Sequence, residues 1–455
     1  MIIRKLFGTD GIRALANSPL MSVEMATKVG AIIGSKLKAT ARTKRVLVGK
    51  DTRLSSYMLE NAISAGLLSS GMDVLLAGTI PTPAVSFLTR SMRCDLGIMI
   101  SASHNQYQDN GIKLFDKFGE KLSKSVESEI EHAFINCDIS NFFCDPSCIG
   151  RAKVLGDICN TRYIELAKSG FVNGQDLSGL RVVIDCANGA NYKIAPEVLW
   201  ELGADVIVIG NEPNGKNINH NCGSTFVSPL QEKVIQTRAD IGIALDGDGD
   251  RVIVVDENGK IADGDEIIAA ISTNLSNSNE LKSKYIITTI MSNLGLEKYL
   301  KSQNLEMVRT DVGDKNVYEA MKKYDSSIGG EQSGHIILRK FCTTGDGLMS
   351  GLNILFIMKS LKKTASQVLH NFEKIPQYSA KIEFINKPSK DISKELNKIS
   401  NTHLLRMKDS RIILRQSGTE NIIRITLETT EDNYQTVMDD LKTETIALLQ
   451  NNKCI

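Results

Sequence analysis

Several features that would assign this chain to a specialised class of protein are absent or scarce. Its 455 residues contain only 9 prolines and no low-complexity tract, so long disordered segments are not expected. No apolar stretch is long enough to span a membrane, and the opening MIIRKLFGTDGIR has no signal-peptide pattern. These absences predict a fully folded protein of the cytoplasm that has no membrane partner.

An excess of charge of one sign is also missing. With 54 basic and 53 acidic side chains the net charge is +1, so no overall field attracts nucleic acid. The nine cysteines include no CxxC pair, and the closest group, Cys137, Cys144 and Cys148, has no adjacent histidine at ligand spacing. We therefore expect free thiols rather than a zinc site, and local clusters of charge wherever an anion binds.

The chain is long enough for several domains, each with its own core. A β-α-β pattern recurs three times, because the strand-like runs RVLVG, RVVIDC and YIITTI each precede an amphipathic stretch and a second strand. After about residue 370 the runs YSAKIEFI, RIILRQ and IIRITLE alternate in polarity, which is typical of half-exposed strands. The sequence predicts an α/β protein of three related α/β domains with mixed sheets, followed by a smaller C-terminal α+β domain. The predicted domains are residues 1–160, 161–257, 258–372 and 373–455.

The strongest single feature is the stretch ADIGIALDGDGDRVIVVDENG. A predicted strand is followed by Asp246, Asp248 and Asp250 at every second position. Alternate side chains of a straight strand lie about 6.6 Å apart, so Gly247 and Gly249 are needed to curl the backbone until the carboxylates converge. Clustered carboxylates repel one another, and all-oxygen ligation by few protein groups favours one Mg²⁺ as the compensating cation.

Two other interpretations of this loop explain less. A plain polar turn would use the glycines but has no need of concentrated charge. An EF-hand loop would carry acids at the positions of Asp246, Asp248, Asp250 and Glu257. Its sixth position, however, requires glycine and holds Arg251, and the flanks IGIAL and VIVVD are strands rather than helices.

The stretch ISASHNQYQDNGIK carries the second candidate group. Ser103 follows the apolar strand LGIMI and has His104 beside it, and the cation of Lys113 could neutralise phosphate oxygens. In isolation such a stretch is more often a polar turn whose serine and asparagine bond to nearby backbone. The chain has no G-x-S-x-G elbow that would indicate acyl transfer, whereas an acidic metal loop favours phosphoryl transfer.

Other stretches have the residues for binding anions or sugar hydroxyls. RQSGTENIIR places hydroxyls, backbone N–H groups and two guanidiniums around a turn between strands, which suits a phosphate dianion, although a plain hairpin is the alternative. GGEQSGH combines flexible backbone with Glu331, Ser333 and His335, which suits sugar hydroxyls, although a glycine-rich loop is the alternative. FGTDGIR and GKDTR add cations near glycine turns.

Together these stretches resemble the α-D-phosphohexomutase superfamily, and the match runs the length of the chain. FGTDGIR, SASHN with DNGIK, DGDGDR, GEQSGH and RQSGTE occur in that family's order and approximate spacing. VGKDTRLSSYMLE, CANGA, EPNGKNIN, CGST, MSNLGLE, VGDK and TTGDG are similar to the branch that acts on glucosamine phosphates. The resemblance implies a four-domain molecule built around a central active-site cleft.

The resemblance also implies roles for individual residues. Ser103 would be the phosphorylated serine, and one Mg²⁺ would be bound by Asp246, Asp248, Asp250 and a phosphate oxygen on Ser103. Glu331 and Ser333 would bind sugar hydroxyls. The phosphate that is not transferred would be bound by Arg415, Ser417, Gly418, Thr419 and Arg424. Candidates for acid–base or electrostatic help are Arg13, His104, Lys113, Arg251 and His335.

The implied reaction moves phosphate between C6 and C1 of glucosamine phosphate. Phosphorylated Ser103 would donate to the C1 hydroxyl of glucosamine 6-phosphate and be rephosphorylated from C6 of the 1,6-bisphosphate. Glucosamine or glucose 1,6-bisphosphate would act as the activating intermediate, and the product would supply UDP-N-acetylglucosamine synthesis. Glucose and mannose phosphates are the alternative substrates, and a phosphatase or a Ca²⁺-regulated binding module is the alternative class. We expect a monomer or homodimer whose partner is a phosphosugar.

Two positions depart from the family pattern. Gln106 after SASHN and Asn421 after SGTE stand where the family usually has proline. Proline presets backbone angles, so its absence loosens the unfolded ensemble of each loop without removing a reactive group. The reactive residues are therefore retained, and only the rigidity of the two loops is expected to differ from the family pattern.

Overall fold

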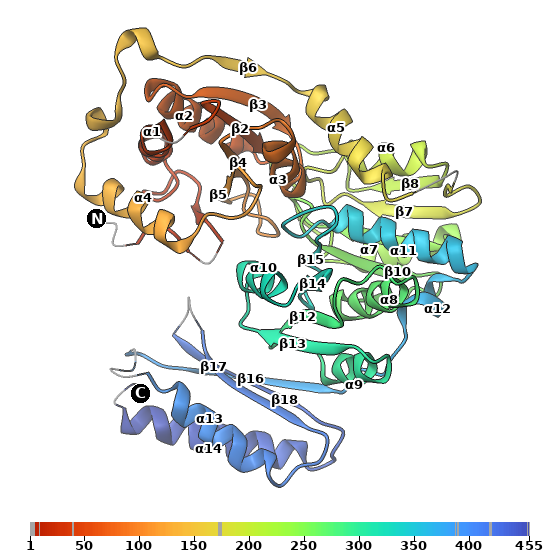
Figure 1. The fold of residues 1–455 in the computed structure, drawn as a ribbon. Helices are drawn as coiled ribbons and strands as arrows, with labels where there is room; N and C mark the ends of the chain where they lie inside the picture. Colours follow the sequence, from red (N-terminus) through yellow and green to blue (C-terminus); the bar gives the residue numbers. More distant parts are fainter. Residues whose placement is uncertain are drawn as a thin grey trace. The chain divides into compact units, whose positions relative to one another are not determined.

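The computed structural model describes residues 5–8, 10–38, 41–171, 175–386, 388, 391–417, 421–452 and 454. The chain divides into two compact units (Figure 1), one formed by Met1–Thr289 and Leu305–Asn371, the other by Ile290–Asn304 and Phe372–Ile455. Four sheets are present among the described residues, three in the first unit and one in the second.

The first sheet has six strands in the order β1-β5-β4-β2-β3-β6. Its strands are β1 (Ile12–Leu15), β2 (Arg45–Lys50), β3 (Asp73–Thr79), β4 (Leu96–Ile100), β5 (Asp109–Asp116) and β6 (Ala152–Val154). The β2, β3, β4 and β6 strands run parallel, whereas β5 is antiparallel to both β4 and β1. The sheet is therefore mixed. Its helices are α1 (Val23–Lys38), α2 (Leu54–Ser69), α3 (Thr82–Ser91) and α4 (Lys124–Asn136).

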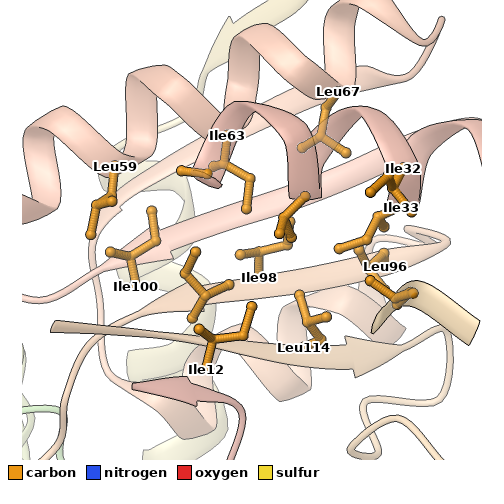
Figure 2. Packing of buried hydrophobic residues seen from close by; sticks show 14 of the residues in the cluster. Ile12, Ile32, Ile33, Leu59, Ile63, Leu67, Leu96, Ile98, Ile100 and Leu114 are labelled. Atoms are coloured by element: carbon orange, nitrogen blue, oxygen red, sulfur yellow. The ribbon is translucent and has the colours of Figure 1, made fainter. Parts of the chain in front are cut away.

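Sequence periodicity explains the core of this sheet. Apolar residues four apart place Leu59, Ile63 and Leu67 on one face of α2, and alternation places Ile98 and Ile100 on one face of β4. Figure 2 shows these two faces packed against each other, with all five side chains buried. Burial of this kind is the main favourable term in folding.

Helices α1 and α2 approach closely because glycines lie at their contact. A Cβ atom on Gly30 would lie 2.4 Å from the carbonyl oxygen of Ile63, and one on Gly66 would lie 2.1 Å from that of Thr27. Any larger residue at either position would therefore separate the helices.

The second sheet has five strands in the order β11-β10-β9-β7-β8. Its strands are β7 (Arg181–Asp185), β8 (Asp205–Ile209), β9 (Ile241–Leu245), β10 (Val252–Asp256) and β11 (Ile261–Ala262). The β7 strand pairs in parallel with β8 and β9, and β9, β10 and β11 are antiparallel neighbours. Helices α5 (Asp157–Lys168), α6 (Ile194–Glu201) and α7 (Ser228–Thr237) accompany it. Every residue of β9 and β10 is buried, so the acidic loop that joins them projects from a rigid hairpin.

The third sheet has the order β13-β12-β14-β15. Its strands are β12 (Tyr285–Thr289), β13 (Glu306–Thr310), β14 (Ile328–Gly330) and β15 (Ile336–Leu338). Helices α8 (Gly264–Asn277), α10 (Asp314–Lys323), α11 (Gly347–Leu361) and α12 (Ala365–Leu369) accompany it. The GGEQSGH stretch lies at the turn between the antiparallel strands β14 and β15.

The second unit contains an antiparallel sheet in the order β16-β18-β17. Its elements are β16 (Gln377–Glu383), β17 (Arg411–Gln416), β18 (Ile422–Glu428), α9 (Leu294–Ser302), α13 (Ser393–Leu404) and α14 (Tyr434–Asn451). Residues Leu396, Ile423, Ile425 and Leu441 are among those that form its core. The fold class predicted from the sequence, three α/β domains with mixed sheets and a small C-terminal domain, is confirmed.

Among the described residues, no helix combines the length and the apolar character needed to cross a membrane. All nine cysteines are free thiols.

Candidate active site

The acidic loop between β9 and β10 brings three carboxylates together. Asp246, Asp248 and Asp250 each place one carboxylate oxygen within 4.8 Å of the others, and all three are buried. The two glycines between them are required by space and by conformation. Gly249 has a φ of +71°, and a Cβ on Gly247 would lie 2.7 Å from the carbonyl oxygen of Ser103.

This cluster has the charge and the vacant acceptor that a hard cation would use. Burial raises the pKa of Asp246 well above its usual value, and the neighbouring carboxylates of Asp250 and Asp248 raise it further. Oxygen Oδ1 of Asp248 is buried and accepts no hydrogen bond from any described residue. Buried carboxylate oxygens are the ligands preferred by Mg²⁺, so the residues present fit a divalent cation.

Lys113 on β5 neutralises part of this charge from the first sheet. Its ammonium donates to Asp248 at 2.8 Å and to Asp250 at 2.9 Å, and lies 3.3 Å from Asp10. Burial alone would lower the pKa of Lys113, but these three carboxylates outweigh that effect and hold the pKa well above its usual value. The side chain is therefore a cation at neutral pH and, in this state, supplies charge rather than accepting a proton.

Ser103 points at the acidic loop from the turn between β4 and β5. Its Oγ donates to Asp246 Oδ2 at 2.6 Å and lies 3.4 Å from Asp250 Oδ1. The residue is buried and has a φ of +51°, a left-handed conformation that a non-glycine residue rarely adopts. Such a conformation persists only where surrounding structure enforces it, and it clusters at functional sites.

His104 lies beside the serine hydroxyl, with Nδ1 3.4 Å from Ser103 Oγ. Burial lowers the pKa of His104 to about 4, and the nearby guanidiniums of Arg251 and Arg13 contribute to the shift. The imidazole is therefore neutral near pH 7.

The two arginines come from different sheets, Arg13 from the first and Arg251 from the end of the acidic loop in the second. Arg13 on β1 contacts Asn105 Oδ1 and Asp10 Oδ2, each at 3.4 Å. Arg251 ends the acidic loop, and its backbone pairs with that of His335, which joins the second sheet to the GGEQSGH turn. His335 Nε2 lies 3.9 Å from Asp250 Oδ2 and 3.4 Å from Asp314 Oδ2.

Three further charged residues complete this set, and sequence reasoning assigned none of them a role. Lys121 forms ion pairs with Asp10 and with Asp314, which in turn contact Lys113 and His335. Burial would raise the pKa of Asp10, but Lys113 and Lys121 hold it well below its usual value. Asp10 and Asp314 lie in the motifs FGTDGIR and VGDK, whereas Lys121 belongs to no motif that the sequence analysis identified.

A cavity of about 230 Å³ adjoins these residues, with Lys121, Asp314, Lys315 and Tyr318 among its lining.

In the GGEQSGH turn Glu331 accepts a hydrogen bond from the backbone N–H of Gly313 at 3.1 Å, and Ser333 is exposed.

The residues of the RQSGTE stretch lie in the second unit. Arg415 on β17 and Arg424 on β18 are directly paired in register, and the backbone N–H of Ser417 donates to Ile422. Gly418 and Thr419 lie outside the described residues.

Comparison with known proteins identifies the class. Three family models match, described as phosphoglucomutase/phosphomannomutase alpha/beta/alpha domains I, II and III, over residues 4–138, 161–259 and 263–375 respectively. The chain belongs to the phosphoglucomutase/phosphomannomutase family, within the α-D-phosphohexomutase superfamily that its sequence motifs resemble.

Within that family, curated relatives at about 50% identity are named phosphoglucosamine mutase. The chain is 50% identical over 426 residues to the phosphoglucosamine mutase of Rhizobium etli, covering 93% of this chain and 94% of that protein. A phosphoglucomutase/phosphomannomutase family protein from Burkholderia thailandensis has the same fold, with a TM-score of 0.83 at 22% identity, covering 100% of this chain and 98% of that one. The N-acetylphosphoglucosamine mutase of Aspergillus fumigatus, solved with GlcNAc-6P and magnesium, has a TM-score of 0.64 at 17% identity over 98% of this chain and 96% of that one.

Proposed function

We propose that this protein interconverts glucosamine 6-phosphate and glucosamine 1-phosphate, the reaction that the name of its relatives describes. The curated relatives at about 50% identity support the substrate. The single observation that supports the chemistry is the contact of 2.6 Å between Ser103 Oγ and Asp246 in a buried aspartate cluster. A buried serine at such a cluster suits reversible phosphorylation, because phosphoryl transfer depends mainly on positioning and on neutralising charge.

In the proposed reaction Ser103 carries the phosphoryl group between two substrate oxygens. The C1 hydroxyl of glucosamine 6-phosphate attacks the phosphorus, its O–P bond forms as the Ser103 Oγ–P bond breaks, and the hydroxyl proton leaves to a base. The 1,6-bisphosphate then presents its C6 phosphate to Ser103, whose hydroxyl attacks in the same way, so that glucosamine 1-phosphate is released. Each half-reaction conserves one phosphoryl group.

The charged residues around Ser103 would prepare the site for this transfer. Asp246, Asp248 and Asp250 would hold one Mg²⁺, which when bound would neutralise charge on the phosphoryl group. Lys113 would supply a fixed positive charge beside the same carboxylates. Arg13, His104, Arg251 and His335 are proposed to assist electrostatically or in proton transfer.

Substrate binding is proposed to use two loops. Glu331 and Ser333 would bind sugar hydroxyls. Arg415, Ser417, Gly418, Thr419 and Arg424 would bind the phosphate that stays in place. Arg415 and Arg424 are paired in register across two strands, which places two positive charges side by side for a dianion. Glucosamine or glucose 1,6-bisphosphate would activate the enzyme, and we further propose a cytoplasmic monomer or homodimer whose product supplies UDP-N-acetylglucosamine synthesis.

Two measurements on purified protein test this function. Incubation with glucose 1,6-bisphosphate should add one phosphoryl mass to the peptide that contains Ser103, and glucosamine 1-phosphate should form from the 6-phosphate faster than the corresponding products form from glucose or mannose 6-phosphate. Ser103→Ala should lose both signals while remaining folded. Ser140→Ala, at an exposed serine, is the matched control and should behave as wild type. Mutase activity near wild type in Ser103→Ala would reject the phosphoserine, and release of free phosphate would indicate a phosphatase.

A further inference from the structure

The guanidinium of Arg53 is buried beneath the loop that carries Ser103. Its Nε donates to Asp51 at 2.7 Å, and its two terminal nitrogens donate to four backbone carbonyls of that loop. These acceptors are the carbonyl oxygens of Ser103 at 2.9 Å, Asn105 at 2.8 Å, Gln106 at 2.5 Å and Asp109 at 3.1 Å. All five N–H groups of the guanidinium are thereby used, four of them on a single loop.

The side-chain amide of Asn219 repeats half of this pattern from the second sheet's side. Its Nδ2 donates to the carbonyl oxygens of Ser103 at 2.8 Å and of Asn105 at 3.0 Å, the same two oxygens that Arg53 Nη2 contacts. Each of these oxygens therefore accepts two hydrogen bonds, one from the segment before α2 and one from the segment that follows β8. Among the described residues nothing donates to the buried Asn219 Oδ1, so the amide contributes through its donors at a cost to stability.

A third hydrogen bond links the Ser103 loop to the segment that carries Asn219. The side chain of Gln106 donates to the backbone carbonyl of Asn219 at 3.2 Å. Gln106 stands where the superfamily usually has proline. Its side chain tethers the Ser103 loop to the segment that carries Asn219, which a proline ring could not do because it has no donor. The loop that lacks the proline is therefore held by hydrogen bonds.

These contacts fix the backbone conformation of Ser103. The carbonyl of Ser103 is fixed by two donors while its side chain reaches Asp246, so the strained φ of +51° is enforced from the backbone side. Without either donor the residue is free to relax towards ordinary dihedral angles, which would swing Oγ away from the acidic loop.

We propose that Arg53 and Asn219 are positioning residues for phosphoryl transfer. Their donors clamp the carbonyls of Ser103 and Asn105 from two sides, which aligns the Ser103 side chain with the aspartate cluster. Gln106 reinforces this clamp. The inference rests on the proposed phosphoserine function. It predicts that loosening the clamp slows the transfer step itself, because a misplacement of about 1 Å can cost about 100-fold in rate.

The test is a single-turnover experiment on the full-length protein. Enzyme phosphorylated with glucose 1,6-bisphosphate is mixed with glucosamine 6-phosphate, and loss of the phosphoryl group is followed by rapid quench and intact-mass analysis. Asn219→Asp has the same shape but replaces both donors with oxygen, so the rate constant should fall about 100-fold at unchanged amplitude. Gln106→Ala removes only the tether and should lower the rate constant several-fold. Asn217→Ala is the matched control, since its side chain bonds within its own turn, to Glu212 and Asn214.

The amplitude and the rate constant separate the possible outcomes. A purely structural role would leave fewer competent molecules, which lowers the amplitude and leaves the rate constant of the remainder unchanged; that result would overturn the proposal, as would an Asn219→Asp rate within twofold of wild type. If Asn219→Asp does not fold, Asn219→Ser is judged by the same criterion. Wild-type protein that accepts phosphate on Ser103 but transfers none to the sugar would overturn the proposed function, and the clamp with it.

Discussion

Oδ1 of Asp248 is a buried carboxylate oxygen that no donor in the described chain satisfies, while Oδ2 of the same group accepts from Lys113 at 2.8 Å. One face of this carboxylate is thus neutralised within the protein, and the other is left for a ligand. Burying an acceptor without a partner costs about 1–3 kcal/mol, so a cation that binds there regains that free energy.

Asp248→Asn should therefore weaken metal binding more than it weakens folding. Losing one charged ligand should raise the Mg²⁺ concentration for half-maximal activity more than about tenfold. The thermal unfolding midpoint without metal should stay the same or rise, because repulsion among the three carboxylates falls while Lys113 keeps Asp250 and Asp10 as partners. Titration calorimetry with Mg²⁺ provides a readout that is independent of turnover. Asp138→Asn, at an exposed aspartate, is the control. Equal Mg²⁺ affinity in Asp248→Asn and wild type would argue for a different set of ligands.

Residues differ in how far their neighbours could be predicted. The convergence of Asp246, Asp248 and Asp250 followed from their spacing and from the glycines between them, because all three lie on one short loop. The network of Lys121, Asp10 and Asp314 joins Lys121 to partners 111 and 193 residues away in the chain. The sequence around Lys121 does not indicate which distant acids it will contact, so these ion pairs are seen only in the tertiary structure.

At the scale of elements, two loops from different sheets meet with almost no clearance. The acidic loop approaches the Ser103 loop through Gly247, where a Cβ would lie 2.7 Å from both the carbonyl oxygen of Ser103 and Nδ2 of Asn219. Neither atom can yield without breaking the hydrogen bonds that fix the Ser103 loop. A glycine at this position is therefore a requirement of contact as well as of curvature.

Gly247→Ala should consequently displace the Ser103 loop from the aspartates. We expect mutase activity to fall about 100-fold with only a modest loss of thermal stability, because the strain is local and the hairpin of β9 and β10 is otherwise unchanged. Gly170→Ala is the control, since its nearest neighbour would be an ordinary contact at 3.7 Å and its φ is unexceptional. Full activity in Gly247→Ala would show that the two loops do not need to be in contact.

A second element-scale prediction concerns the start of α11. The carboxylate of Asp346 caps this helix by accepting from the N–H of Met349 and also accepts from the hydroxyl of Tyr163 on α5. Burial raises the pKa of Asp346 to about 6 from an ordinary 3.8, despite the opposing effect of these donors. The fold thus favours the protonated acid, so its contribution to stability is present below pH 4, declines as pH rises through the window from 4 to 6, and is absent above it.

Asp346→Asn should remove this pH dependence. The amide oxygen can still accept from Met349 and Tyr163, but the penalty for a buried charge, about 3 kcal/mol above pH 6, is gone. Urea unfolding midpoints should therefore be higher in the variant than in wild type at pH 7.5 and should converge near pH 4. A difference between variant and wild type that is the same at both pH values would show that ionisation of Asp346 is not its cause.

At the scale of the whole molecule, each compact unit is built from two separate stretches of the chain. The repeated β-α-β pattern predicted three α/β domains and a tail, and the sheets agree with it. Periodicity carried this information because it records which face of an element is buried. It did not reveal that α9 and the turn before it, Ile290–Asn304, belong to a compact unit with Phe372–Ile455. The domain boundaries at residues 160, 257 and 372 stay predictions.

The ion pair of Arg411 and Glu428, whose carboxylate is fully buried, is one of the contacts behind that association. The two side chains meet through two hydrogen bonds of 2.8 Å each, Arg411 also donates to the carbonyls of Ile290 and Ser292, and Glu428 accepts from the N–H of Leu294. The exposed fraction of the Glu428 side chain is 0%. One ion pair on the C-terminal sheet thus satisfies the backbone of a turn more than a hundred residues earlier in the chain.

Glu428→Gln should therefore loosen two distant stretches of sequence together. Removing the carboxylate leaves Arg411 without its countercharge, which for a buried pair costs about 3–5 kcal/mol. Hydrogen exchange should accelerate in parallel in residues 290–304 and 372–455 and stay unchanged in β2. Glu383→Gln, at the exposed end of β16, should change stability by less than about 1 kcal/mol. If residues 290–304 keep their protection while the C-terminal sheet loses its own, the turn is held by other contacts, such as the two hydrogen bonds between Asn293 and Ile375, and not by the ion pair.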